Sequence, residues 1–262
     1  MLSRNSIPVL MYHHVSPEGR GISISPSVFE DHVRFLKRSG WRTLRGDEFI
    51  EVIHQKKIKE RYVVLTFDDG FADNYVYAYP ILKRYGMKAI LFVTTSFIED
   101  IDIKRDGFKP LPHEEAWGLA FTERRHEVMC TWNELREMEG SGVFDIQAHS
   151  HTHNTPSYIK GKRYSELRED LLVCKKLLKE RLSKEIQHLS WPKGCYDYEA
   201  IRIATGAGFN AIYTTERGAN TAGNLREIRR LSVKRGGRWL INRLNIYSST
   251  FLSRLYLFLR WG

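Results

Sequence analysis

The sequence predicts a single α/β domain, a deformed (β/α) barrel of about seven parallel strands, with an insertion and a C-terminal amphipathic helix. Short apolar runs alternate with amphipathic segments along the 262 residues, which is the order of βαβ units. The runs at residues 62–67 and 89–93 are apolar throughout, as strands covered on both faces are. No Gly-x-Gly-x-x-Gly motif follows the first strand, so a dinucleotide-binding sheet has no support.

Each element is predicted from its hydrophobic period and its end signals. Ser27 and Glu30 form a capping box at the start of a helix that ends at Gly40. Thr131 and Glu134 form a second capping box at the start of a helix over residues 131–139. Further helices are expected at residues 48–54, 73–85, 164–182 and 198–207. The strands are expected at residues 7–12, 62–67, 89–93, 143–148, 189–191, 209–214 and 231–233.

Two stretches depart from this alternation and set the domain boundaries. Residues 1–235 are expected to form the barrel domain, in which residues 99–129 are long, polar and mixed in charge, as an insertion over one rim is. We expect this insertion to act as a lid or a substrate wall. Residues 236–262 are expected to form a basic amphipathic helix.

The net charge of +10 lies mainly at the C-terminal end of the chain. No Asp or Glu follows Glu227, and the basic residues beyond it are Arg229, Arg230, Lys234, Arg235, Arg238, Arg243, Arg254 and Arg260. The rest of the chain is almost neutral, which argues against a nucleic-acid-binding protein.

Apolar residues from 240 to 259 recur at helical spacing between Trp239 and Trp261. A large apolar face with only arginine for charge is typical of a helix in a membrane interface, where each basic residue near an anionic leaflet contributes about 1 kcal/mol. A terminal helix packed on the barrel is the alternative interpretation.

The location is inferred from what the sequence lacks. No run approaches the roughly 18 apolar residues of a membrane span, and the N-terminal residues lack the hydrophobic core of a signal peptide. Cys130, Cys174 and Cys195 are odd in number, which favours reduced thiols. We therefore expect a cytoplasmic protein, with a peripheral position on the inner face of the membrane as the further option.

Polar residues follow several predicted strands, at the end of a parallel barrel where catalysis takes place. These residues are His13 and His14, Asp68 and Asp69, His149, His151 and His153, and Pro192 and Lys193. In a turn, His149 and His153 share one face, and two imidazoles with one carboxylate leave an open position on a catalytic metal. The alternatives are an extended chain with all three histidines on one side, a solvent-exposed histidine-rich loop, and a helix cap formed by the two aspartates.

The segments Thr66-Phe67-Asp68-Asp69-Gly70 and His149-Ser150-His151-Thr152-His153 together resemble the polysaccharide deacetylases, the NodB-homology fold of carbohydrate esterase family 4. The segment at residues 8–15, Pro-Val-Leu-Met-Tyr-His-His-Val, is similar to the branch that deacetylates poly-β-1,6-N-acetylglucosamine, in which the motif order is circularly permuted. The resemblance runs from about residue 7 to residue 233 and leaves residues 99–129 unmatched.

The resemblance implies a role for each matched residue. Asp69, His149 and His153 would hold a divalent metal, most readily zinc, with cobalt, nickel or manganese as alternatives. Asp68 would be the general base and His13 the general acid, and the backbone N–H of Lys193 would stabilise the oxyanion. The substrate would be contacted by Tyr12, His14, Trp191, Pro192 and Lys193.

The sequence departs from the family pattern around the base. The arginine that often precedes the Pro192 motif is absent, so Lys193, Arg229 and Arg230 are all candidates to pair with Asp68. Trp191 either stacks on a sugar or fills the barrel core. His113 and His126 lie in the insertion and are expected at its surface.

The resemblance implies hydrolysis of the N-acetyl group of an N-acetylhexosamine. The substrate would be a polysaccharide or a lipid-linked precursor, such as a lipopolysaccharide or exopolysaccharide intermediate. The alternatives are a deformylase of a lipid-linked amino sugar and an inactive glycan-binding or membrane-binding protein.

Overall fold

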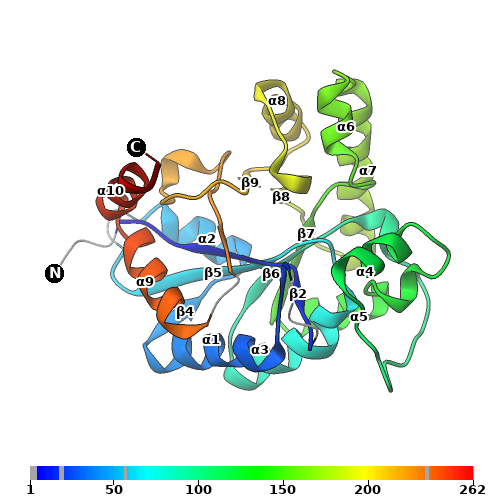
Figure 1. Cartoon of the computed structure of the whole chain (residues 1–262). Coiled ribbons are helices and arrows are strands. Elements are labelled where there is room, and N and C mark those ends of the chain that lie inside the picture. Colours follow the sequence, from blue (N-terminus) through cyan, green and yellow to red (C-terminus); the bar gives the residue numbers. More distant parts are fainter. Residues whose placement is uncertain (1–4, 18–20, 56–57, 234–235, 262) are drawn as a thin grey trace.

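The computed structural model describes residues 5–17, 21–55, 58–233 and 236–261 (Figure 1). A parallel sheet curls into the predicted deformed barrel, in the order β10-β1-β5-β6-β7-β8-β9. These strands are β10 (Leu231–Ser232), β1 (Val9–Tyr12), β5 (Arg61–Phe67), β6 (Ala89–Val93), β7 (Phe144–Ala148), β8 (His188–Ser190) and β9 (Ala211–Tyr213). The short strand β4 (Trp41–Thr43) pairs with the start of β5, and β2 (His14–Val15) pairs with β3 (Ser23–Ile24).

The segment from Ile228 to β10 lies between the two edges of the curled sheet. Ile228 forms a parallel bridge with Tyr213 of β9, and Leu231 is in register with Leu10 of β1. The chain therefore crosses from one edge strand to the other within a few residues, and the side chains between these two positions are brought to the barrel.

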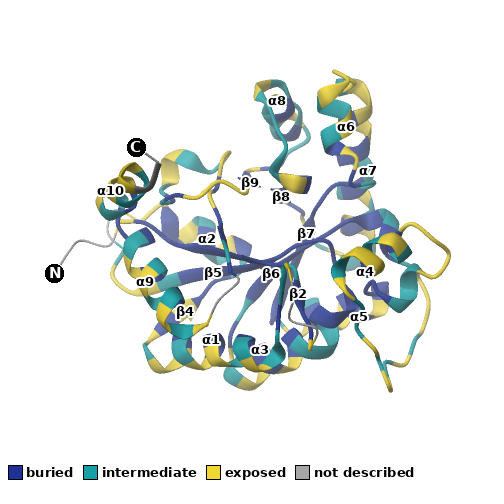
Figure 2. Ribbon diagram, in the orientation of Figure 1, coloured by how far each residue is buried: buried dark blue, intermediate teal, exposed yellow. Residues whose placement is uncertain are grey.

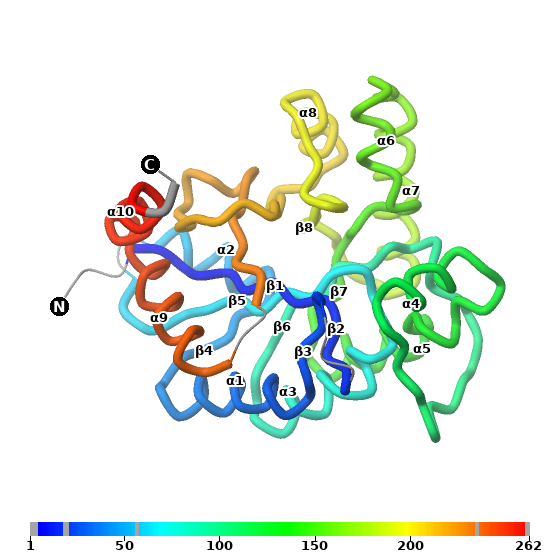
Figure 3. Tube along the Cα trace, viewed as in Figure 1, coloured from blue at the N-terminus to red at the C-terminus, as the bar shows by residue number. Residues whose placement is uncertain are grey.

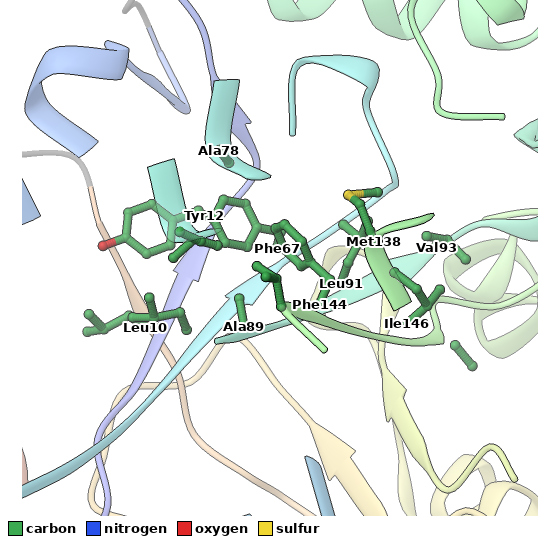
Figure 4. Close-up of a cluster of buried hydrophobic side chains, with 14 of the residues drawn as sticks. Leu10, Tyr12, Phe67, Ala78, Ala89, Leu91, Val93, Met138, Phe144 and Ile146 are labelled. Atoms are coloured by element: carbon green, nitrogen blue, oxygen red, sulfur yellow. The ribbon is translucent and has the colours of Figure 1, made fainter. Parts of the chain in front are cut away.

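Helices cover the outer face of the sheet, and alternate strand residues point to opposite sides. Leu10, Tyr12, Leu65 and Phe67 belong to the cluster that packs against these helices, part of which Figure 4 shows. The opposite residues, such as Val64 and Phe92, fill the barrel interior with apolar side chains of α2. Figure 2 accordingly shows the strands as buried throughout most of their length.

The helices agree with the predicted pattern in most places. They are α1 (Pro26–Arg38), α2 (Gly46–Ile53), α3 (Tyr79–Tyr85), α4 (His113–Ala120), α5 (Trp132–Gly140), α6 (Thr155–Lys160), α7 (Tyr164–Leu182), α8 (Tyr198–Gly206), α9 (Gly237–Tyr247) and α10 (Thr250–Trp261). The capping box of Thr131 and Glu134 is present at α5. The predicted box at Ser27 is wrong, because Ser25 is the N-cap of α1 and its hydroxyl accepts a hydrogen bond from the N–H of Val28.

Two predicted helices are divided in the structure. Residues 73–85 form a π-helical turn, η1 (Asn74–Ala78), followed by α3. The C-terminal segment forms α9 and α10 rather than one helix, because the backbone N–H of Asn5 donates to the carbonyl of Ser248 and the Ser248 hydroxyl bonds back to Leu244. The N-terminal chain thus holds the break between the two helices (Figure 3).

The insertion at residues 99–129 packs beside the carboxyl ends of β5 and β6. Ala116 and Ala120 of α4 share an apolar cluster with Phe71, which follows β5, and Phe97, which follows β6. This cluster places α4 at the rim where the candidate residues lie. Among the described residues, none forms a helix with the length and apolar character needed to cross a bilayer.

Replacing Gly46 by alanine should destabilise the protein by about 1–3 kcal/mol, because an added Cβ would lie 2.6 Å from both Asp145 Oδ2 and His188 Nε2 in the packed base of the barrel. Gly118→Ala is the matched control, since no atom lies within 4 Å of its added Cβ. It should stabilise the exposed helix by about 0.5–1 kcal/mol. Urea denaturation measures both, and equal effects of the two substitutions would contradict this packing.

Candidate active site

Asp69, His149 and His153 converge at the carboxyl ends of β5 and β7. Asp69 Oδ1 lies 3.3 Å from His149 Nε2 and 3.4 Å from His153 Nε2. One ligand atom from each residue lies within 4.8 Å of the others. A carboxylate and two imidazoles are a donor set suited to zinc and other first-row divalent cations. The residues therefore fit a divalent metal with open coordination positions.

Neighbouring groups orient both imidazoles. His149 Nδ1 lies 2.8 Å from the carbonyl oxygen of Ser190, so the protonated Nδ1 donates there and Nε2 keeps its lone pair for a cation. The ring of His153 packs edge-to-face on Trp117 of the insertion, with 4.6 Å between ring centroids. Nε2 is the atom that faces Asp69 in both histidines, and it is therefore the atom that could hold a metal.

The loop that carries the histidines is held from α7. The Asp170 carboxylate accepts the backbone N–H groups of His151 and Thr152 at 2.7 and 3.0 Å. The His151 imidazole bonds to the Thr95 hydroxyl at 2.8 Å and takes no part in the triad. The loop thus adopts the turn in which only His149 and His153 share the site.

Unusual backbone conformations gather at the same place. Among the described residues, six besides glycine have positive φ, and four of these are Asp69, Ser150, His153 and Lys193. Such conformations are costly and persist where the surrounding structure imposes them, often at functional sites. Their concentration here supports the assignment of this rim as the active site.

Asp68, adjacent to the triad, is paired with Arg230 inside the barrel. The two guanidinium nitrogens Nη1 and Nη2 lie 2.7 and 2.8 Å from Asp68 Oδ1 and Oδ2. The exposed fractions of the two side chains are 0% for Arg230 and 4% for Asp68. A bidentate pair of this kind fixes the plane of the carboxylate as well as its charge.

All five N–H groups of Arg230 have an acceptor. Besides Asp68, these acceptors are the Thr214 carbonyl, the Thr66 hydroxyl and the Ser190 hydroxyl, at 2.8, 3.2 and 2.8 Å. The guanidinium also lies over the Phe92 ring, 5.8 Å from its centroid. Arg230 is therefore the partner of Asp68, whereas the candidates Lys193 and Arg229 are exposed side chains.

The ion pair decides the protonation of Asp68. Burial alone would raise the pKa of Asp68, but the charges of Arg230 and His149 and the hydrogen bonds from Arg230 outweigh it and hold the pKa below its ordinary value. Asp68 is therefore ionised at neutral pH and can accept a proton. Arg230 does not itself act as one of the basic groups of the C-terminal tail, as its charge is neutralised in the barrel.

His13 directly follows β1 on the same rim. Burial lowers the pKa of its imidazole, and the nearby carboxylates Asp68 and Asp69 oppose that shift. Its backbone carbonyl accepts a hydrogen bond from Asn74 at 3.1 Å. The acid assigned by resemblance therefore lies close to both the base and the metal triad.

Three residues expected at the substrate are placed differently. Tyr12 is 2% exposed and stacks on Phe67, and Trp191 is 0% exposed in the same core. These rings point to the helix layer, so neither offers a face to a sugar. His14 is also buried and its ring nitrogens contact Asp73 and His113.

The segment after β8 retains the expected oxyanion donor. Pro192 is buried and Lys193 is exposed, with a left-handed backbone at φ 56°. Among the described residues, no acceptor bonds the backbone N–H of Lys193. That N–H is consequently available to a ligand.

Sequence reasoning missed the contribution of the insertion. His113, expected at the surface, is half-buried and lies 3.0 Å from His14, and Trp117 contacts His153. Ser190 and Asp170, which orient the metal loop, were also not singled out. Only their contacts in the folded protein reveal these roles, because a lone serine next to a strand or an aspartate in a helix forms no recognisable sequence motif.

The comparisons with known proteins agree with this site. The sequence profile of the family described as Polysaccharide deacetylase matches residues 55–212, which include Asp68, the triad and Lys193 but neither His13 nor Arg230. YxkH of Bacillus subtilis, which bears the name of that family, is 30% identical over 214 residues, covering 81% of this chain and 66% of YxkH.

Two further comparisons concern the enzyme branch and the fold. A poly-beta-1,6-N-acetyl-D-glucosamine N-deacetylase of Staphylococcus aureus is 26% identical over 238 residues, covering 83% of this chain and 74% of that protein. The structure of IcaB from Ammonifex degensii has a TM-score of 0.76 at 21% identity, covers 94% of this chain and 98% of its own, and has the same fold.

Arg230→Met should lower the free energy of unfolding by about 3–5 kcal/mol, because it leaves the Asp68 carboxylate buried and unpaired. Arg229→Met, at the exposed neighbouring position, is the control and should change it by less than about 0.5 kcal/mol. Combining Arg230→Met with Asp68→Asn should restore part of the loss in urea denaturation. No restoration would contradict the ion pair as the cause.

The same pair predicts a dependence on pH. Because the folded-state pKa of Asp68 lies below its ordinary value of 3.8, the pair stabilises the fold fully above that value and progressively less as the pH falls through the folded pKa. The stability difference between wild type and Arg230→Met should therefore narrow below about pH 3.8. A gap that stays constant down to acid unfolding would contradict this assignment.

Proposed function

Because this chain belongs to the polysaccharide deacetylase family, a family of hydrolases acting on carbon–nitrogen bonds other than peptide bonds, we propose that it removes the N-acetyl group of an N-acetylhexosamine. The substrate is a polysaccharide or a lipid-linked glycan precursor. The observation that carries this proposal is the position of an arginine-held carboxylate, Asp68, directly beside the Asp69, His149 and His153 triad.

The two aspartates have separate tasks in this reaction. Asp69, His149 and His153 hold a divalent cation, for which we propose zinc. When bound, such a cation supplies Lewis acidity, which polarises the acetyl carbonyl and makes water a stronger acid. Asp68 accepts a proton from the attacking water, and Arg230 keeps that carboxylate ionised and oriented.

The other polar groups act on the collapsing intermediate. The free backbone N–H of Lys193 donates to the oxyanion that forms from the acetyl carbonyl. His13 donates a proton to the nitrogen of the departing sugar amine. Acetate and a free amino sugar are the products.

The rim beside the triad supports a glycan as substrate. Trp117 lies edge-to-face with Phe121, with 5.3 Å between ring centroids, and Phe121 is 55% exposed. Exposed aromatic surface next to convergent polar groups is typical of small-molecule sites, and sugar rings present apolar C–H faces to such surface. The staphylococcal relative, whose name specifies poly-beta-1,6-N-acetyl-D-glucosamine, makes polymers of N-acetylglucosamine the first substrates to test.

The test separates base from metal ligand. Asp68→Asn should strongly lower acetate release while zinc, measured by elemental analysis, stays bound, whereas Asp69→Asn should lose both the zinc and the activity. Loss of the base should cost about 10²–10⁴-fold in turnover. Acetylated and formylated amino-sugar glycans and lipid-linked sugars serve as substrates for the purified protein.

Each outcome of this experiment supports or excludes one of the candidate functions. Release of formate alone would replace the deacetylase by a deformylase. Zinc bound without release from any substrate would favour an inactive glycan-binding protein. Neither zinc nor release would contradict the proposed reaction.

We also propose that α10 lies on an anionic membrane surface, on the cytoplasmic side. The exposed fractions of Phe251, Phe258 and Leu259 are 64%, 73% and 74%, and the spacing of these residues with the exposed Leu255 forms one apolar face of α10. The exposed Arg254 and Arg238 supply charge complementary to anionic lipid.

The packing of the two C-terminal helices supports α10, and not α9, as the helix that contacts the membrane. Leu240, Leu244 and Tyr247 of α9 are buried in the apolar layer between the sheet and its outer helices, so α9 is docked on the barrel, whereas α10 has an exposed apolar face. The three cysteines are free, which suits a reducing compartment.

The triple variant Phe251→Ser, Phe258→Ser and Leu259→Ser should lose flotation with phosphatidylglycerol vesicles that the wild-type chain retains, because the apolar anchor is removed. Phe121→Ser combined with Tyr198→Ser removes exposed aromatics elsewhere and is the control. Wild-type flotation should weaken with salt and with uncharged phosphatidylcholine. Failure of the wild type to float with either vesicle would contradict the membrane proposal.

A further inference from the structure

A second group of imidazoles lies next to the metal triad and comes from separate parts of the chain. His14 of β2 is 2% exposed and lies between two partners. His14 Nδ1 is 2.6 Å from Asp73 Oδ2, and His14 Nε2 is 3.0 Å from His113 Nδ1 at the start of α4. Figures 1 and 3 show α4 beside β2, where this contact joins the insertion to the barrel.

The positions of the protons in the series Asp73–His14–His113 follow from which atoms can donate and which can accept. The Asp73 carboxylate can only accept, so His14 donates from Nδ1. Between His14 Nε2 and His113 Nδ1 one nitrogen must carry a proton and the other a lone pair. The contact therefore survives with both rings neutral or with one ring charged, and it breaks when both rings are protonated.

These contacts fix the backbone at the carboxyl side of His13. The side chain of His14, the next residue, is fixed by Asp73 and His113, and its ring lies 3.9 Å from that of Phe71 between centroids. The carbonyl of His13 itself accepts from Asn74, which opens the π-helical turn. The backbone that aims the His13 imidazole thus has its anchors in η1 and in the insertion.

We propose that His113, through His14 and Asp73, is a positioning residue for His13, so that the insertion helix α4 is part of the acid side of the active site. This inference rests on the role of His13 in the proposed function. It assigns to the insertion a task in turnover beyond that of a wall.

The charged groups around His113 favour the intact contact at neutral pH. Burial lowers the pKa of His113, His14 and His13 lower it further, and Asp69 and Glu114 oppose the shift. Asp73, which is hydrogen-bonded to His14, is the remaining charged group in the series Asp73–His14–His113. The lowered pKa favours a neutral His113 ring, with which the hydrogen bond to His14 stays intact.

The test uses the full chain loaded with Zn²⁺ and labelled with ¹⁵N in its histidine rings. His113→Ala should shift the ring signals and titration of His13, whereas His113→Gln, whose amide can still donate to His14, should leave them near the wild-type positions. His126→Gln is the matched control, because His126 lies in the same insertion and bonds to Glu99 instead. Unchanged His13 signals in His113→Ala, or equal shifts in all three variants, would overturn the inference.

Kinetics supply the second readout. His113→Ala should lower kcat about tenfold with little change in KM, well short of the 10²–10⁴-fold contribution of a general acid, and His113→Gln should recover most of it. The acid limb of the wild-type pH profile should contain an inflection that His113→Gln lacks, since glutamine does not titrate. If wild type releases no acyl group from any glycan, the proposed function fails, while the ring signals of His13 still decide the positioning role.

Discussion

The buried ion pair of Asp68 and Arg230 is the interaction on which the active site depends. A carboxylate in the barrel interior is costly unless it is paired and hydrogen-bonded, and here one guanidinium provides both conditions. Arg230 reaches Asp68 only because the segment from Ile228 to β10 crosses between β9 and β1. The same segment therefore closes the barrel and keeps Asp68 ionised, because its loss would leave the Asp68 carboxylate unpaired.

The same arrangement separates the base from the metal ligands. Both oxygens of Asp68 are engaged by Arg230, whereas Asp69 turns to the two histidines through a backbone with φ 75°. Two adjacent carboxylates would otherwise compete for the same cation. Ser190 serves both sides, because its hydroxyl accepts from Arg230 and its carbonyl accepts from His149. A small displacement of β8 would consequently disturb the base and the metal site together.

Much of this structure was predictable from local sequence. The strand at residues 89–93 and the helix at residues 164–182 have the predicted bounds, because apolar runs and helical periods are local signals. The metal triad was predictable because its two motifs directly follow strands of the parallel sheet, β5 and β7, whose carboxyl ends lie on the same rim. Arg230 was one of three candidates, because it lies 162 residues from Asp68 and stands within the basic stretch that follows Glu227. His113 and the break before α10 depend on contacts with His14 and Asn5, which no local pattern reveals.

The central claim is that the triad binds the metal while Asp68 stays on Arg230 as the base. Anomalous X-ray diffraction from crystals of the zinc-loaded protein tests it most directly. The account predicts one zinc peak about 2.0–2.2 Å from Asp69 Oδ1, His149 Nε2 and His153 Nε2, with the Asp68–Arg230 pair intact. A peak ligated by Asp68 with Arg230 displaced, or the absence of zinc from the triad at full loading, would contradict it.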